Sequence, residues 1–203
     1  MRWRIFRNSN EIISRGILLF MSRNFVHLHT HSHYSLLEAL PKIPDLVEAA
    51  KKDGQTVLAL TDNGNMYGSI EFYKECKQQG LKPIIGVDFF VAPRTRNDRE
   101  HKVDDQLGRL VLLAKNDAGY HNLLKLVSAS YLEGFYVRPR IDRELIEKYR
   151  DGLVAILPSH AGEPAYALRH AQPDRASQAL EWYKKLFGAD CYVEITRHPE
   201  IVG

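Results

Sequence analysis

The sequence of 203 residues contains little cysteine and no long apolar segment. Cys76 and Cys191 are its only cysteines, which excludes a disulfide-rich scaffold and a four-cysteine zinc site and fits a reducing cytoplasm. No run approaches the ~18 apolar residues that cross a bilayer, so we expect no membrane protein. The consensus G-x-x-x-x-G-K-[ST] is missing, which excludes an ATPase of the P-loop type.

The composition is otherwise that of an ordinary globular protein, with 44% hydrophobic and 26% charged residues. The 13 glycines and nine prolines follow no period, which excludes collagen-like and low-complexity chains. The net charge of +3 is too small to indicate nucleic-acid binding by itself. Nine histidines are present, and this is the unusual count, because four of them fall within His27–His33.

The first 20 residues form a basic leader, with four arginines against a single glutamate. The apolar run at 17–20 is too short for a secretory signal, and no small-residue cleavage site follows it. An organelle-targeting segment stays a less favoured alternative to a simple upstream extension. Met21 resembles a natural start directly before a strand. We therefore predict a disordered extension over residues 1–20 and one domain over residues 21–203.

Strands and helices are predicted to alternate along the rest of the chain. The expected strands are 25–29, 56–61, 83–91, 110–114, 153–157 and 192–195, and the expected helices are 43–52, 68–79, 120–132, 163–170 and 174–187. This alternation predicts an α/β fold with a parallel sheet, and the lack of a nucleotide-binding glycine turn favours a barrel over a Rossmann sheet. A complete barrel needs ~250 residues, so we expect one truncated before its last strand–helix unit. The charged stretch 94–106 is expected to be a mobile loop.

Histidines alternate at the end of the first predicted strand, at His27, His29, His31 and His33. Side chains two residues apart in an extended chain point to the same side. Active sites of barrels lie at the carboxyl ends of their strands, and imidazoles suit metals such as Zn²⁺ or Mn²⁺. The pattern therefore predicts a metal centre, while a purely structural H-x-H pair remains open.

Carboxylates follow the apolar runs of the next two predicted strands, with Asp62 after Leu58–Thr61 and Asp88 after Ile84–Val87. A carboxylate at a strand end can ligate or bridge metal ions. Asp62 fits a turn cap equally well. Asp88 lies between Val87 and Phe89, and a buried carboxylate in apolar surroundings needs a cation or hydrogen-bond donors. We therefore expect Asp88 in the site.

Three long segments of the chain resemble a known family. They read FVHLHTHSHYSLLEAL, ALTDNGNMYGSIEFYKECKQQGLKPIIGVDFFV and LVLLAKNDAGYHNLLKLVSASYLEGFYVRPRID. They resemble, in order, the N-terminal PHP (polymerase and histidinol phosphatase) domain of bacterial DNA polymerase III alpha subunits. The resemblance runs from about Phe25 to His198. It implies a distorted (β/α)₇ barrel that, in active members, holds up to three metal ions.

The resemblance also implies a set of metal ligands, namely His29, His31, Glu38, Asp88 and His160. His29 and His31 match the two motif histidines of the family, and Glu38 matches an acidic position. Asp88 matches a bridging carboxylate. His160 adjoins a position where the family often has cysteine.

Two residues depart from the family pattern. Asn63 falls where the family usually has histidine, and Arg109 falls where many members have histidine. An amide oxygen is a poor ligand for zinc, and a guanidinium carries a permanent positive charge that opposes cation binding. We therefore expect a partly degraded site that binds one Zn²⁺ or Mn²⁺ ion weakly or none.

The resemblance implies DNA-templated DNA synthesis by the full-length protein, with Mg²⁺ and the catalytic aspartates in a domain outside this chain. The chain itself is expected to be a scaffold, and at most a metal-dependent phosphoesterase or 3′–5′ exonuclease. Implied partners are DNA, a proofreading exonuclease subunit and a sliding clamp, in the cytoplasm. The first alternative is a stand-alone PHP metallophosphatase, such as one for histidinol phosphate. The second is a non-catalytic module for the proofreading subunit. The segment from Gly134 to Asp142 favours the polymerase.

Overall fold

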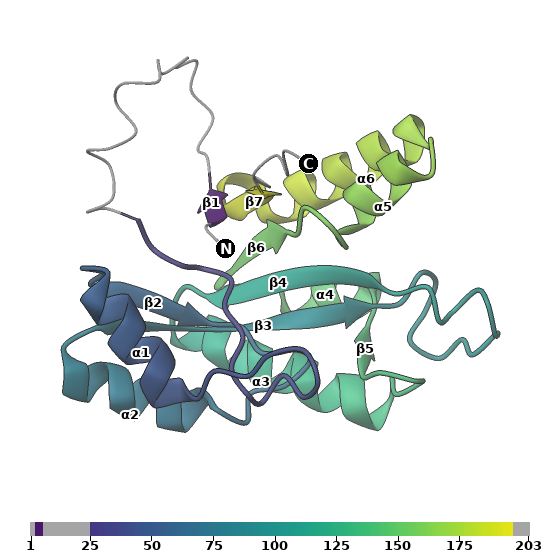
Figure 1. Cartoon of the computed structure of the whole chain (residues 1–203). Helices are drawn as coiled ribbons and strands as arrows, with labels where there is room; N and C mark the ends of the chain where they lie inside the picture. Colours follow the sequence, from purple (N-terminus) through teal and green to yellow (C-terminus); the bar gives the residue numbers. More distant parts are fainter. Residues whose placement is uncertain (1–2, 6–24, 197–203) are drawn as a thin grey trace, which may run out of the picture.

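The computed structural model describes residues 3–5 and 25–196 and shows one mixed sheet flanked by helices (Figure 1). The strands are β1 (Trp3–Ile5), β2 (Val57–Leu60), β3 (Lys82–Val91), β4 (Gly108–Ala114), β5 (Arg140–Ile141), β6 (Leu153–Leu157) and β7 (Cys191–Thr196). The α-helices are α1 (Ile43–Lys52), α2 (Ser69–Gln79), α3 (Asp117–Leu132), α4 (Arg143–Tyr149), α5 (Glu163–Arg169) and α6 (Pro173–Phe187). In the described ranges no helix has the length and apolar character needed to cross a bilayer.

The expected disordered extension falls mostly outside the described residues. Of residues 1–20, the structure describes only 3–5, which form β1 and pair antiparallel with β7. The nature of the remaining leader and the domain start at Met21 therefore stay predictions.

The strand order is β1-β7-β6-β4-β3-β2, with β5 paired to β3. The β2–β3 and β6–β7 pairs are parallel, but β4 is antiparallel to both β3 and β6. The prediction of an entirely parallel sheet is therefore wrong. The reason lies in residues 92–107, which contain no α-helix to carry the chain back, so β4 returns beside β3 in the opposite direction.

The predicted first strand lies along β2 as an extended segment. The Ala59 amide donates to the carbonyl of His27 at 3.0 Å, and the Thr61 amide donates to that of Thr30 at 2.8 Å. No strand in the described part of the chain closes the sheet from this segment to β7. The mixed α/β architecture with an open sheet confirms the expected truncated barrel.

The main core lies between the central strands and the helices that cover them. In Figure 1, α1, α2 and α3 lie on one side of β2, β3 and β4, while α5 and α6 lie beside β6 and β7. The fully buried side chains of this core come from separate elements and include Phe89, Leu112, Leu123, Ile146 and Tyr183. Burial of these apolar groups fixes the strand ends that carry the polar cluster described below.

The stretch 94–106, expected to be a mobile loop, makes many contacts with the rest of the chain. Arg140 is 0% exposed, and its guanidinium donates to four main-chain carbonyls in total. Three of them belong to the loop, at Arg96, Asp98 and Asp104, and the fourth belongs to Gly134. The anchor of this stretch is therefore a buried cation.

Candidate metal centre

His29 and His31 come from the extended segment beside β2 and the loop after it, and their side chains meet Asp88 of β3. Their potential ligand atoms all lie within 4.8 Å of one another. His29 Nε2 lies 3.0 Å from Asp88 Oδ2, and His31 Nε2 lies 3.4 Å from the same oxygen. Three of the five predicted ligands are thus brought together, with two of the four alternating histidines among them.

Glu194 on β7 completes the surroundings of His29, and the sequence analysis missed it. Its Oε1 lies 3.0 Å from His29 Nδ1. Burial alone would lower the pKa of His29, but hydrogen bonds to Asp88 and Glu194 outweigh burial and raise the pKa to about 9. Each ring nitrogen of His29 therefore faces a carboxylate oxygen. A glutamate inside the apolar predicted strand 192–195 was the available signal.

Arg109 on β4 donates hydrogen bonds to both carboxylate oxygens of Asp88. Its Nε donates to Oδ1 at 2.9 Å and its Nη2 donates to Oδ2 at 2.6 Å. Asp88 is only 3% exposed, and burial would raise its pKa. Contacts with His29, His31 and Arg109 reverse this effect and hold the pKa of Asp88 well below its usual range.

Glu38 lies at the rim of the cluster and does not touch the histidines. Asn63 Nδ2 donates to Glu38 Oε2 at 2.5 Å, and Asn63 Oδ1 accepts from Arg109 Nη2. Glu38 also lies 3.9 Å from Arg109 Nη1 and 3.7 Å from Arg138 Nη2. Asn63 and Arg109, the two departures from the family pattern, therefore both lie inside the site.

His160 lies apart from this cluster. It is exposed, and its Nδ1 lies 3.1 Å from Arg169 Nη1. The neighbouring Ser159 approaches the cluster only through its amide, which lies 3.4 Å from Glu194 Oε2. Among the four alternating histidines, His27 and His33 also lie outside the group of three.

Asp62 acts as a turn cap. Its Oδ1 accepts from the Ser32 amide at 2.7 Å and from the Ser35 hydroxyl at 2.6 Å, and its Oδ2 accepts from the Ser32 hydroxyl at 2.7 Å. Of the two roles left open for Asp62, the structure shows the cap. This cap fixes the loop that carries His31 and Glu38.

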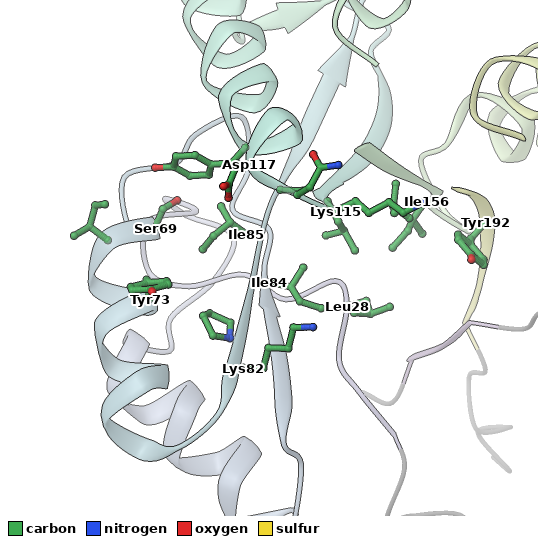
Figure 2. A pocket seen from close by; sticks show the side chains of 17 residues that line it. Leu28, Ser69, Tyr73, Lys82, Ile84, Ile85, Lys115, Asp117, Ile156 and Tyr192 are labelled. Atoms are coloured by element: carbon green, nitrogen blue, oxygen red, sulfur yellow. The ribbon is translucent and has the colours of Figure 1, made fainter. Parts of the chain in front are cut away.

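Two hollows flank the sheet, and only one of them reaches the cluster. A hollow of about 940 Å³ is lined in part by His29, His31 and Glu38, but Asp88 does not line it. A second pocket of about 740 Å³ contains Leu28, Ile84 and Ile156, with polar groups at its edge, and none of the predicted ligands lines it (Figure 2).

The donor set does not fit a metal ion as it stands. Both nitrogens of His29 and both oxygens of Asp88 already have partners. His31 Nε2 is buried and lies 3.4 Å from Asp88 Oδ2. With a guanidinium on its carboxylate, this group of two histidines and one aspartate falls short of the ligand sets that hold Zn²⁺ or Mn²⁺.

Residues 27–198 match the profile of the PHP domain, so the chain belongs to the PHP domain family. Membership of this family supports divalent metal binding in general terms, and the cluster of His29, His31 and Asp88 is the place to test it. A solved amidohydrolase structure from Chromobacterium violaceum, with bound sulfate and no metal, aligns with 52% of this chain and 32% of its own at a TM-score of 0.39 and 20% identity. That likeness is too slight to support an inference.

The curated relatives point to one kind of protein. The chain is 48% identical over 184 residues to DNA polymerase III subunit alpha of Borreliella burgdorferi, and 44% identical over 177 residues to that of Treponema pallidum. The corresponding protein of Aquifex aeolicus is 43% identical over 184 residues. These alignments cover 88%, 86% and 86% of this chain but 16%, 15% and 16% of the relatives. The chain thus matches a small part of each relative, and the family resemblance in the sequence is confirmed.

Proposed function

We propose that this chain serves as the N-terminal PHP domain of a replicative DNA polymerase, whose full length carries out DNA-templated DNA synthesis. The 48% identity to the Borreliella burgdorferi polymerase subunit carries this proposal. Synthesis would depend on Mg²⁺ and on catalytic aspartates outside this chain. The chain alone would at most hydrolyse phosphoesters.

The proposal includes partners and a compartment. DNA and replisome subunits follow from the relatives' role as polymerase subunits. A proofreading exonuclease subunit and a sliding clamp are the specific partners we propose, in the cytoplasm. Co-purification of each subunit with the full-length protein tests these partners one at a time.

Within the polymerase, we assign the domain a scaffold role rather than a hydrolytic one. The supporting observation is the double contact between Arg109 and Asp88, which places a fixed positive charge where a catalytic metal would need an anionic ligand. Any Zn²⁺ or Mn²⁺ would bind weakly.

The second candidate is a metal-dependent phosphoesterase, either as a 3′–5′ exonuclease or as a stand-alone phosphatase for a substrate such as histidinol phosphate. The buried Nε2 of His31 beside Asp88, and the hollow that His31 helps to line, favour this candidate. The polymerase relatives argue against the stand-alone form.

The test uses the full-length protein on a primed single-stranded template. We expect primer extension with Mg²⁺ and nucleotides, and no shortening of the primer without nucleotides when Zn²⁺ or Mn²⁺ is supplied. Failure of extension contradicts the polymerase proposal. Primer shortening that His29→Ala abolishes, or hydrolysis of histidinol phosphate, contradicts the scaffold role.

A further inference from the structure

We propose that Arg109, held by Asn63, is a resident cation that makes the polar cluster a metal-independent clasp. Its guanidinium supplies the positive charge that a divalent ion would bring to Asp88. The inference deepens the proposed scaffold role and rests on it.

The contacts of Arg109 are those of a built-in partner and not of a surface charge. Its side chain is 14% exposed and that of Asp88 is 4% exposed. Two parallel hydrogen bonds from a planar guanidinium match the carboxylate fork, which a point charge cannot do. The guanidinium carbon also lies 4.3 Å from the centre of the Phe90 ring, which adds a cation–π contact from the same strand as Asp88.

The side-chain amide of Asn63 bridges Arg109 and a second carboxylate, that of Glu38. Its amide oxygen accepts from Arg109, and its amide nitrogen donates to Glu38. An amide can do both because its two ends have opposite polarity, whereas an aspartate has no donor. The oxygen that could have served a metal is thus directed at the guanidinium.

Both carboxylates next to Arg109 have arginine partners without an ion. Asp88 and Glu38 carry the negative charges nearest to Arg109, and Arg109 and Arg138 face them. A divalent cation at Asp88 would have to displace a guanidinium from a buried carboxylate, against charge repulsion and the loss of two hydrogen bonds.

The clasp joins segments that are distant in sequence. Asp88 belongs to β3, Arg109 to β4, Asn63 to the turn after β2, and Glu38 to the loop before α1. The main chain supports the same junction, because the Gly64 amide donates to the Asp88 carbonyl at 2.8 Å. The consequence is a domain whose stability is indifferent to chelators.

The experiment begins with unchanged full-length protein. We expect elemental analysis to find well below one equivalent of zinc or manganese, and the melting temperature of the domain to be the same with EDTA, ZnCl₂ or MnCl₂. Hydrogen exchange of β3 and β4 peptides identifies the transition that belongs to this domain. A full equivalent of metal, or a melting temperature lowered by EDTA, overturns the inference, and neither measurement requires a variant to fold.

Variants then test whether Arg109 supplies the charge. Arg109→Gln should lower the melting temperature by about 5 °C or more, because it leaves a buried carboxylate without its cation. Added ZnCl₂ should raise the melting temperature of Arg109→Gln and leave the unchanged protein unaffected. Arg109→Lys keeps the charge without the fork and should lie between the two. The matched control is Arg175→Gln, which removes an exposed arginine on α6 and should change nothing.

Two results speak against the resident cation here. One is equal melting temperatures for Arg109→Gln and Arg175→Gln, and the other is a zinc response in the unchanged protein. Primer extension by the unchanged protein is measured in parallel. Its failure would remove the polymerase proposal without altering the metal content or the melting data, so the two failures are distinguishable.

Discussion

Asp62 and Ser32 are joined by two hydrogen bonds of 2.7 Å, one from the serine amide and one from its hydroxyl. The carboxylate is 1% exposed and accepts a third bond from Ser35. Because the cluster needs the loop after residue 30 in one conformation, this cap positions His31 and Glu38 without touching either.

Replacing Asp62 with alanine should destabilise the chain by about 3 kcal/mol, since two serine hydroxyls and one amide lose a charged acceptor. Denaturant unfolding followed by circular dichroism measures the change. Asp45→Ala removes an exposed carboxylate from the first turn of α1 and should cost less than about 1 kcal/mol. Equal losses of unfolding free energy in the two variants would show that the cap does not stabilise the chain more than an exposed carboxylate does.

Arg140→Lys should loosen the stretch 94–106. A lysine ammonium has three donors on a flexible stem and cannot reproduce four carbonyl contacts, so we expect a loss of about 2–3 kcal/mol. Tryptic cleavage after Arg99 or Lys102 should become faster. Arg143→Lys, at a half-exposed pair with Glu163, is the matched control and should cost less than about 1 kcal/mol. Unchanged cleavage in Arg140→Lys would mean that the loop does not depend on this anchor.

Periodicity located most helices and strands well. The predicted helix 43–52 coincides with α1, and the predicted strands 83–91 and 153–157 fall within one residue of β3 and β6 at each end. These elements rely on local patterns of apolar residues, which a single sequence displays directly. The helix α4 and the short strand β5 were missed because seven and two residues are too few to show a periodic apolar pattern.

Only the site residues that belong to a recognisable local sequence pattern could be predicted. Alternating imidazoles and a carboxylate after a strand indicated His29, His31 and Asp88, and the structure brings them together. Glu194 is distant in sequence, and its role depends on strand order, which periodicity does not reveal. The direction of β4 likewise depended on a connection without a helix. The sequence showed that the positive charge of Arg109 opposes cation binding, but its two hydrogen bonds to Asp88 could be seen only in the structure.

Gly119 should tolerate no side chain. A Cβ at this position would lie 1.9 Å from the carbonyl oxygen of Gly152, so Gly119→Ala must separate α3 from the turn before β6. We expect a loss of about 3 kcal/mol in thermal or denaturant unfolding. Gly80→Ala is the comparison, because its φ of 81° is unfavourable for alanine although no atom lies within 4 Å. It should cost about 1 kcal/mol, and a larger effect at Gly80 than at Gly119 would contradict the steric account.

As the pH is lowered, the contacts around Asp104 should be lost only well below the ordinary pKa of an aspartate. The hydrogen bond from Arg94 is the main cause that lowers the pKa of Asp104 to about 2. Because the folded pKa lies below the ordinary value of ~3.9, this stabilisation is complete above pH ~4 and is lost as the pH falls through about 2. NMR titration of the Glu100 amide, which donates to Asp104 at 2.8 Å, reports the step. In Arg94→Gln the midpoint should move up towards the ordinary value, and a midpoint near 4 in the unchanged chain would refute the assignment to Arg94.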